Sequence, residues 1–246
     1  MKLLAELISS LNSKTPNFRP TEIYNESWLI KLVLHHAGSI PGDDFPLSFL
    51  EGSTWFPEGL LPTRFKSRYQ GDPWGESRTN ADGTIGHIKI GETGKADLSL
   101  KSNAAQFTVV EAKINSPLAK GVAHAPFYDQ AARNVACMAE TLAQSGVKPA
   151  SLARLDFIVL APQEAVDQGK FSKEMDPKSI QINVKKRVDS FAGEMEDWHM
   201  VHFKPAFEKI HLESLSWEDA IQWISGHKPE IAEQLSIFYE LCLKYN

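Results

Sequence analysis

Two strongly apolar segments flank a long amphipathic segment in the middle of the chain, and this order constrains the fold more than any other feature. The first, FTVVEAKI, spans residues 107–114, and the second, LARLDFIVLAP, spans residues 152–162. Short apolar runs bounded by turn residues predict buried strands. Between them, residues 126–146 carry apolar side chains at helical spacing and end at a glycine. The sequence therefore predicts a strand–helix–strand unit whose strands are buried.

Further elements extend this unit to an α/β fold with a mixed sheet. A helix and two strands are expected before the unit and two helices after it, at residues 21–37, 84–90, 95–100, 216–226 and 228–246. The resulting order is helix, three strands, helix, strand and then helices. Such an order is typical of an α/β sandwich.

The length of 246 residues, with 42% hydrophobic residues, suits one domain over residues 1–246. We expect its core at about 21–161. Residues 38–84 are rich in proline, glycine and aromatic residues without sustained periodicity, which predicts an ordered insertion after the first core helix. Residues 162–246 are expected to form a helical C-terminal elaboration, and residues 1–11 a short amphipathic helix.

The net charge restricts the possible nucleic-acid-binding surfaces, and the cysteine content indicates the cellular compartment. The formal net charge is −5, which excludes a uniformly basic nucleic-acid-binding surface but allows a local basic patch. Cys137 and Cys242 stand far apart and form no metal-binding pair, so a reducing cytoplasm is the expected location. The sequence contains no run of about 18 apolar residues, and we therefore expect no membrane span.

Two carboxylates interrupt neighbouring strands of the predicted sheet. If the strands 95–100 and 107–114 pair about Ala104, Asp97 lies directly opposite Glu111. Like charges at such a position repel, so a proton or a cation must neutralise them. Two hard oxygen ligands suit Mg²⁺, with Mn²⁺ as the alternative, because Mg²⁺ binds through one or two carboxylates and keeps several waters. Lys113, on the face of Glu111, would orient a water or stabilise charge on a phosphate.

An ordinary ion pair is the simpler interpretation of the same residues. Glu111 would then pair with Lys95 or Lys113 at a solvated sheet edge. The aligned Asp97 and the buried pattern around it favour the metal site instead.

Asp97 and the sequence Glu111-Ala112-Lys113, placed on two adjacent strands before a helix and a buried strand, resemble the PD-(D/E)xK nuclease superfamily. That family has an α-β-β-β-α-β core, and the resemblance covers about residues 21–161. It implies a restriction-endonuclease-like fold with Asp97 and Glu111 as metal ligands. It also implies a further metal ligand at the Ala112 carbonyl and a catalytic role for Lys113. Ala96 stands where the family often has proline.

The resemblance also indicates secondary site residues. Many members carry an acid on the first core helix, and Glu26 suits this metal-binding role better than Glu22 because it shares a face with apolar residues. The helix macrodipole alone would also favour a glutamate there. Gln130 and Asn134 lie one turn apart on the later helix. A glutamine here helps to hold the site in some branches, although an ordinary polar helix face has the same pattern.

The stretch TRFKSRY is the candidate nucleic-acid-binding segment. Arg64, Lys66 and Arg68 alternate with Phe65 and Tyr69, which suits phosphate contact combined with base stacking. A solvated, locally charged loop would show the same alternation.

Taken together, these patterns predict a metal-dependent nuclease that acts on a nucleic acid, with DNA favoured over RNA. A homodimer would suit the cutting of both strands of a duplex. Asp82 and His87, just before the predicted sheet, are weaker site candidates. The competing class is a nucleic-acid-binding or assembly module that keeps the fold without the chemistry. A structural ion pair in an unrelated α/β protein is the third alternative.

Overall fold

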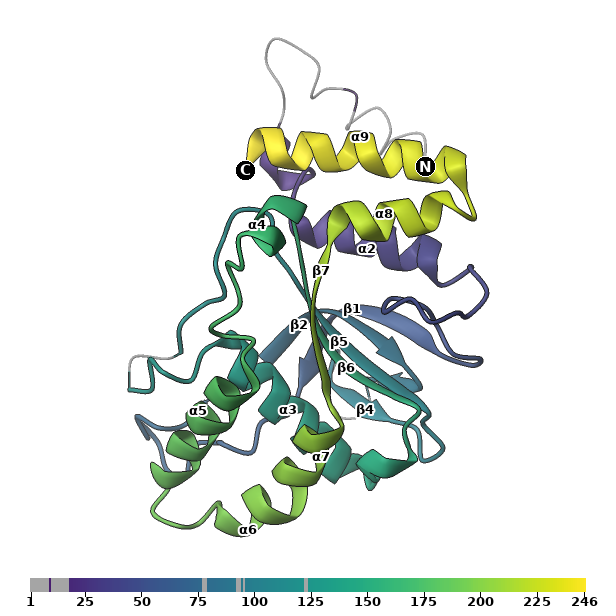
Figure 1. Ribbon diagram of the computed structural model, residues 1–246. Coiled ribbons are helices and arrows are strands. Elements are labelled where there is room, and N and C mark those ends of the chain that lie inside the picture. The colour runs from purple at the N-terminus through teal and green to yellow at the C-terminus, as the bar shows by residue number, and fades with distance from the viewer. Residues whose placement is uncertain (1–8, 10–17, 77–78, 92–93, 95, 122–123) are drawn as a thin grey trace.

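A five-stranded mixed β-sheet forms the centre of the computed structural model (Figure 1), in the order β1-β2-β5-β6-β7. Strand β2 runs antiparallel to both β1 and β5, whereas β6 runs parallel to both β5 and β7. The strands are β1 (Thr54–Leu61), β2 (Thr79–Gly86), β5 (Gln106–Ala112), β6 (Arg154–Ala161) and β7 (His211–Ser216).

The structure describes residues 9, 18–76, 79–91, 94, 96–121 and 124–246. The helix expected over residues 1–11 therefore lies outside the described residues, apart from Ser9. Within the described part, no helix combines the length and the apolar character needed to span a membrane. The helical elements are η2 (Pro20–Glu22), α2 (Glu26–Ala37), α3 (Gln130–Ser145), η3 (Pro149–Ser151), α4 (Gln163–Asp167), α5 (Pro177–Asp189), α6 (Glu196–Trp198), the π-helix η4 (His199–Phe203), α7 (Lys204–Lys209), α8 (Trp217–Ser225) and α9 (Pro229–Tyr245).

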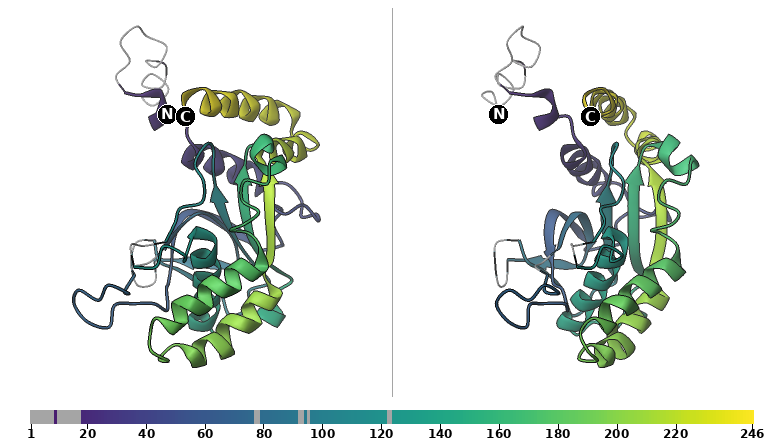
Figure 2. Two further views of the ribbon diagram at one scale, coloured as in Figure 1. Left: turned by 60° about the vertical axis from the view of Figure 1, so that its left-hand side comes forward. Right: turned by 90° about the vertical axis from the view of Figure 1, so that its left-hand side faces the viewer.

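Helices cover both faces of the sheet (Figures 1 and 2). One apolar cluster joins α2, α8 and α9 to the sheet and includes Val110 and Ala112 of β5. The other joins α3, α5 and α7 to the opposite face and includes Phe107 and Val109. Successive side chains of a strand point to opposite faces. Glu111 therefore projects toward the face covered by α3.

The ends of α3 show how local sequence sets the helix bounds. Asp129 is the N-cap, and its side chain accepts a hydrogen bond from the amide of Ala132 at 3.0 Å. Gly146 follows the last turn with φ +66°, a conformation that glycine adopts without steric cost. The helix therefore begins at Gln130, directly after the loop that leaves β5.

The segment 38–84 is not an insertion outside the core, because it supplies β1 and most of β2. The sequence of β2, TNADGTIG, is rich in asparagine, aspartate and glycine, which favour turns and mask a strand. Gly86 is required for the close pairing of β2 with β5. A Cβ atom there would lie 2.2 Å from the carbonyl oxygen of Gln106.

The predicted pairing of Asp97 with Glu111 is wrong. Strand β4 (Leu98–Leu100) pairs with β3 (Ile88–Ile90) in a separate two-stranded sheet. Strand β5 has β2 on one side and β6 on the other, so it has no free edge for β4. Asp97 instead bridges to Leu60 of β1, and both β1 and β2 lie between it and β5 in the sheet order.

The C-terminal part is not wholly helical, since β7 completes the sheet beside β6. The histidine and glutamate in HLESLS hide this strand at the level of sequence. The helical elements after β6 are α4 to α9 and η4. Cys137 and Cys242 are both free thiols and both are buried.

Candidate active site

Asp82 lies where the sequence-based interpretation placed Asp97. In the antiparallel register of β2 and β5, Gly83 pairs with Val110. One further step along this register brings Asp82 opposite Glu111, and the two side chains share a hydrogen bond. The backbone pairing ends at this point, and the amide of Ala112 donates to Asp82 Oδ2 at 2.8 Å instead. Asp82 is thus the acid that meets Glu111.

Glu111 is the centre of the site and is only 1% exposed. Its Oε1 accepts from Lys113 Nζ at 2.6 Å and from Gln130 Nε2 at 2.5 Å. Its Oε2 accepts from Asn134 Nδ2 at 3.1 Å. The ion pair with Lys113 is therefore buried at the end of a central strand and not at a solvated edge. A buried carboxylate needs such partners because it has lost its hydration.

Helix α3 supplies the amide donors of the site. Gln130 is its first residue and Asn134 follows one turn later, on the same side. The Gln130 carbonyl oxygen Oε1 accepts from the amide of Ala119 at 3.0 Å, and its Nε2 therefore faces Glu111. The sequence predicts that the helix carrying Gln130 and Asn134 flanks the site. In the structure both side chains reach Glu111.

The charge of Glu111 acts on the protonation of Asp82. Burial and the charge of Glu111 raise the pKa of Asp82 to about 8, although the Ala112 amide and Lys113 act in the opposite direction. The raised pKa favours the protonated form of Asp82 at neutral pH. A positive charge beside these oxygens would lower the pKa of Asp82 again.

Glu26 lies apart from this pair. It is close to the thiol of Cys242, whose pKa is raised by burial and by the charge of Glu26. Among the residues that the structure describes, no three His, Cys, Asp or Glu side chains form a group that could hold a metal. Neither Glu26 nor Asp97 therefore completes a three-residue metal site with Glu111. Among the described residues, Asp82 and Glu111 are the carboxylates that meet at this site.

The basic segment has a structural role in addition to its charge. Arg68 donates to Asp72 at 2.8 Å, which lowers the pKa of Asp72, and its guanidinium lies over the ring of Phe191 at 4.6 Å. Phe65 is fully buried and therefore cannot stack on a nucleic-acid base. Arg64 and Lys66 remain exposed on the same segment.

His87 belongs to the structural framework at the far end of β2. Its Nδ1 accepts from the amides of Ala105 and Gln106 at 3.3 Å each. Its Nε2 therefore carries the hydrogen and donates to the carbonyl of Glu51 at 2.9 Å. The ring fixes the loop before β5 through these hydrogen bonds and does not join Glu111.

The sequence contained a weak signal for Asp82. Small or apolar residues alternate at positions 79, 81, 83 and 85, which is the period of a strand with one buried face. The pair Asp82-Gly83 is typical of turns, so the sequence did not indicate a strand at these positions.

No family model, no curated protein and no solved structure matches this chain. Its function is therefore inferred from the residues of the site and their geometry.

Proposed function

We propose that this protein is a metal-dependent phosphodiester hydrolase that cuts nucleic acid, with DNA as the preferred substrate. Asp82 and Glu111 would hold Mg²⁺ or Mn²⁺, and Lys113 would assist the attacking water. The observation that carries the proposal is the buried pair of carboxyl groups, one from each of two adjacent strands, with a lysine in contact.

The arrangement of elements supports a restriction-endonuclease-like fold. The order α2, β1, β2, β5, α3, β6 is α-β-β-β-α-β, with the β3–β4 hairpin inserted between the second and third strands. In the resemblance to the PD-(D/E)xK superfamily, Asp82 then takes the role first given to Asp97. Glu111 and Lys113 keep their roles.

The donor set fits a hard divalent cation. Two carboxylates suffice for Mg²⁺, which retains several waters for a phosphate to replace. When bound, the ion would supply Lewis-acid charge and lower the pKa of a coordinated water. Gln130 and Asn134 hold the Glu111 carboxylate in one orientation. Lys113 offers a positive charge beside it for a phosphate oxygen or the attacking water.

One observation also suits the second candidate, a nucleic-acid-binding or assembly module that keeps this fold without catalysis. The Nζ atom of Lys113 is already in contact with Glu111, at 2.6 Å. A lysine whose charge is already paired within the protein can have a purely structural role, as a protein without catalysis would require.

Cleavage assays separate the two candidates. Linear, circular and single-stranded DNA and RNA are incubated with Mg²⁺, with Mn²⁺ and with EDTA. We expect metal-dependent cutting that falls at least about a hundred-fold in Asp82→Asn, Glu111→Gln and Lys113→Ala, as is usual for lost charge stabilisation. Asp97→Asn is the matched control and should retain its rate within a few-fold.

The control also decides between the two acids. Loss of activity in Asp97→Asn but not in Asp82→Asn would overturn the assignment of Asp82. Absence of cutting with either metal, together with nucleic-acid binding that is equally strong in EDTA, would establish the binding module.

A further inference from the structure

One polar atom of the candidate active site has no partner, and it belongs to Asn134 of α3. The side chain of Asn134 is fully buried, and its oxygen Oδ1 has no hydrogen-bond partner within the described part of the chain. We propose that this oxygen accepts a hydrogen bond from a water in the hydration shell of the bound cation. Asn134 is then a positioning residue for that water, a role that rests on the proposed metal-dependent hydrolysis.

The contact with Glu111 fixes which end of the Asn134 amide is left open. Asn134 Nδ2 donates to Glu111 Oε2 at 3.1 Å. The reversed amide would place its oxygen against the carboxylate, and neither of these two acceptors could donate to the other. The oxygen of Asn134 is therefore held away from Glu111 Oε2, in a buried position where an acceptor without a donor is costly.

Gln130 shows that the same helix can satisfy such an amide at both ends. It also donates to Glu111, but its own oxygen accepts from the amide of Ala119 at 3.0 Å. The two amides thus have the same donor role, and of these two only Asn134 keeps an acceptor that no described residue fills. Support of Glu111 alone explains the nitrogen of Asn134 and leaves its oxygen unexplained.

A water on a hydrated divalent cation would be the missing donor. Asp82 and Glu111 offer two carboxylates, and Mg²⁺ fills most of its other coordination positions with waters. The hydrogens of these waters need acceptors, and groups just outside the coordination shell orient what the cation binds. The open oxygen of Asn134 belongs to a side chain that already contacts one of the two carboxylates.

The two oxygens of Glu111 have different neighbours, which gives Lys113 and Asn134 different roles. Lys113 Nζ lies 2.6 Å from Oε1, whereas the amide of Asn134 contacts Oε2. The lysine offers positive charge to a phosphate oxygen or the attacking water. The asparagine oxygen fixes the direction of a water hydrogen, and such orientation contributes to rate because the water no longer has to find its position.

Metal titrations of the full chain test this role separately from cleavage. Mn²⁺ binding is measured by calorimetry, after treatment with EDTA and dialysis, for wild type, Asn134→Ala, Asn134→Leu and Gln130→Ala. We expect both Asn134 variants to weaken Mn²⁺ binding about ten-fold, as is usual for contacts just outside a metal's ligands. Asn134→Leu keeps the approximate volume of the side chain. Gln130→Ala loses a donor to Glu111 but no open acceptor, so it should weaken binding clearly less.

Luminescence lifetimes of bound Tb³⁺ in H₂O and D₂O give a second readout, because they count the waters that contact the ion directly. A hydrogen bond from Asn134 to such a water predicts an unchanged count in Asn134→Ala. A count that rises by one would identify Asn134 as a direct ligand and would overturn the water-mediated role. In cleavage assays, Asn134→Ala should lower kcat at nearly unchanged KM for the nucleic acid.

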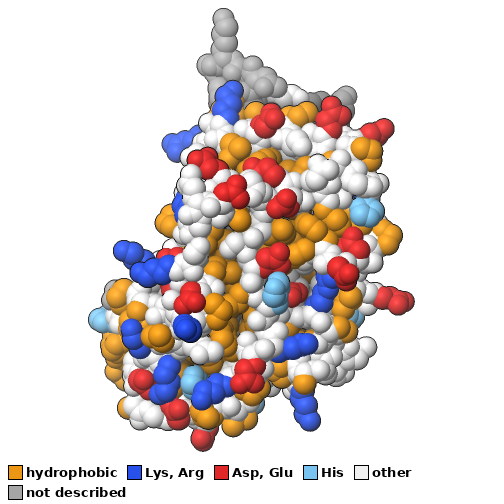
Figure 3. All heavy atoms as spheres, viewed as in Figure 1, with side chains coloured by type: hydrophobic (Ala, Val, Ile, Leu, Met, Phe, Trp, Pro, Cys, Tyr) orange, Lys and Arg blue, Asp and Glu red, His pale blue; other side chains and the backbone are white. Residues whose placement is uncertain are grey.

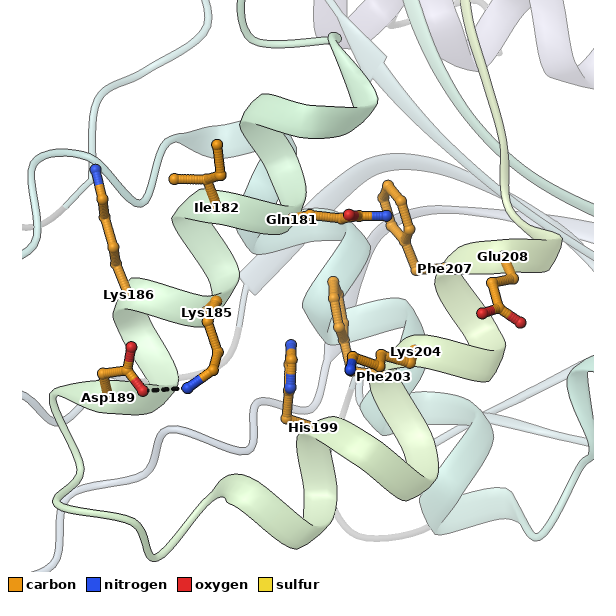
Figure 4. Close-up of a pocket in the computed structure, with 10 residues that line it drawn as sticks. All are labelled: Gln181, Ile182, Lys185, Lys186, Asp189, His199, Phe203, Lys204, Phe207 and Glu208. Atoms are coloured by element: carbon orange, nitrogen blue, oxygen red, sulfur yellow. Dashed lines mark hydrogen bonds and ion pairs between the residues drawn. The ribbon is translucent and has the colours of Figure 1, made fainter.

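Surface carboxylates and an unrelated amide provide the controls. In Figure 3, acidic side chains are frequent over the upper part of the molecule. Such groups add weak metal binding that Asp82→Asn should retain, and this remainder is subtracted as background. Gln181→Ala, on α5 in the groove drawn in Figure 4, changes an amide outside the site and should bind Mn²⁺ like the wild type. Thermal unfolding shows that each variant is folded.

The outcomes separate the role of Asn134 from the proposed function. Wild-type binding that is lost in Asp82→Asn but unchanged in the Asn134 variants would overturn the role of Asn134 alone. Equal losses in Asn134→Ala and Gln130→Ala would also overturn it, since a donor to Glu111 would then explain both. If the wild type binds no more metal than Asp82→Asn, the metal site of the proposed function fails as well.

Discussion

At the scale of single residues, Glu111 shows how a buried acid is made tolerable. Three side chains donate hydrogen bonds to its two oxygens, and a further hydrogen bond joins it to Asp82. Hydrogen bonds to a charged group are worth more than those between neutral groups, which offsets part of the cost of burial. The neighbouring Asp82 has fewer donors and is the member of the pair whose pKa is raised.

The raised pKa of Asp82 predicts a pH dependence of stability in the metal-free protein. The folded pKa of about 8 lies above the ordinary value of 3.8. The associated stability is therefore complete below pH 3.8 and is lost as the pH rises through about 8. The free energy of unfolding should fall by at most about 1.4 kcal/mol per pH unit from this group. Urea unfolding in EDTA between pH 4 and pH 8 measures it.

Asp82→Asn should flatten this pH profile and stabilise the metal-free protein at pH 8, whereas Asp97→Asn should keep the wild-type slope. Mg²⁺ added at pH 8 should raise the stability of the wild type and not of Asp82→Asn, because a ligand that binds only the folded state stabilises it. Equal slopes in wild type and Asp82→Asn would contradict the raised pKa of Asp82.

At the scale of elements, α3 is the part that aligns the site. Asp129 caps the helix through one oxygen and accepts from Asn183 of α5 at 3.0 Å through the other. The next residue, Gln130, donates to Glu111. The start of the helix is therefore held by two elements before it reaches the carboxylate, so an error in its position would move the amide donors.

Removal of this cap should affect both stability and activity. Asp129→Ala should cost about 0.5–2 kcal/mol of stability and reduce metal-dependent cleavage several-fold, because Gln130 loses its anchor. Asp176→Ala removes the equivalent cap of α5, where Asp176 accepts from the amide of Ser179 at 2.8 Å. This control should lose comparable stability and keep its activity. Equal activity losses would show that general destabilisation causes both.

At the scale of the whole molecule, a residue of the C-terminal segment forms a hydrogen bond with the backbone of the site. Trp217, fully buried at the start of α8, donates from Nε1 to the carbonyl oxygen of Lys113 at 2.8 Å. Strand β7 pairs with β6, and α8 and α9 cover the sheet face opposite Glu111. The backbone of Lys113 is thus held by residues that follow it by about 100 positions.

Trp217→Phe should remove this hydrogen bond while it keeps most of the apolar packing. The buried carbonyl of Lys113 then loses a donor, and we expect a loss of about 1–3 kcal/mol together with a lower kcat at nearly unchanged KM. Trp223→Phe on the same helix is the control, since Trp223 Nε1 donates to the exposed Asp43 at 2.7 Å. Thermal unfolding and steady-state kinetics of the two variants should differ in this direction.

The sequence by itself determined the elements with strong periodicity. The segments that became β5, α3 and β6 were predictable because their apolar residues follow a helical period or form a continuous run. Glu111, Lys113 and Gln130 could be predicted as site residues for the same reason, because each lies on one of these elements or directly beside it. Local residue spacing carries that information.

Only the tertiary structure decided which strands are neighbours. Strand β2 was hidden because its turn-forming residues resist strand prediction, yet pairing with β1 and β5 satisfies its backbone. Once β2 and β6 occupy both edges of β5, β4 is excluded, and Asp82 replaces Asp97 opposite Glu111. Strand partners are chosen by contacts between segments distant in sequence, and a pattern within one segment does not contain them.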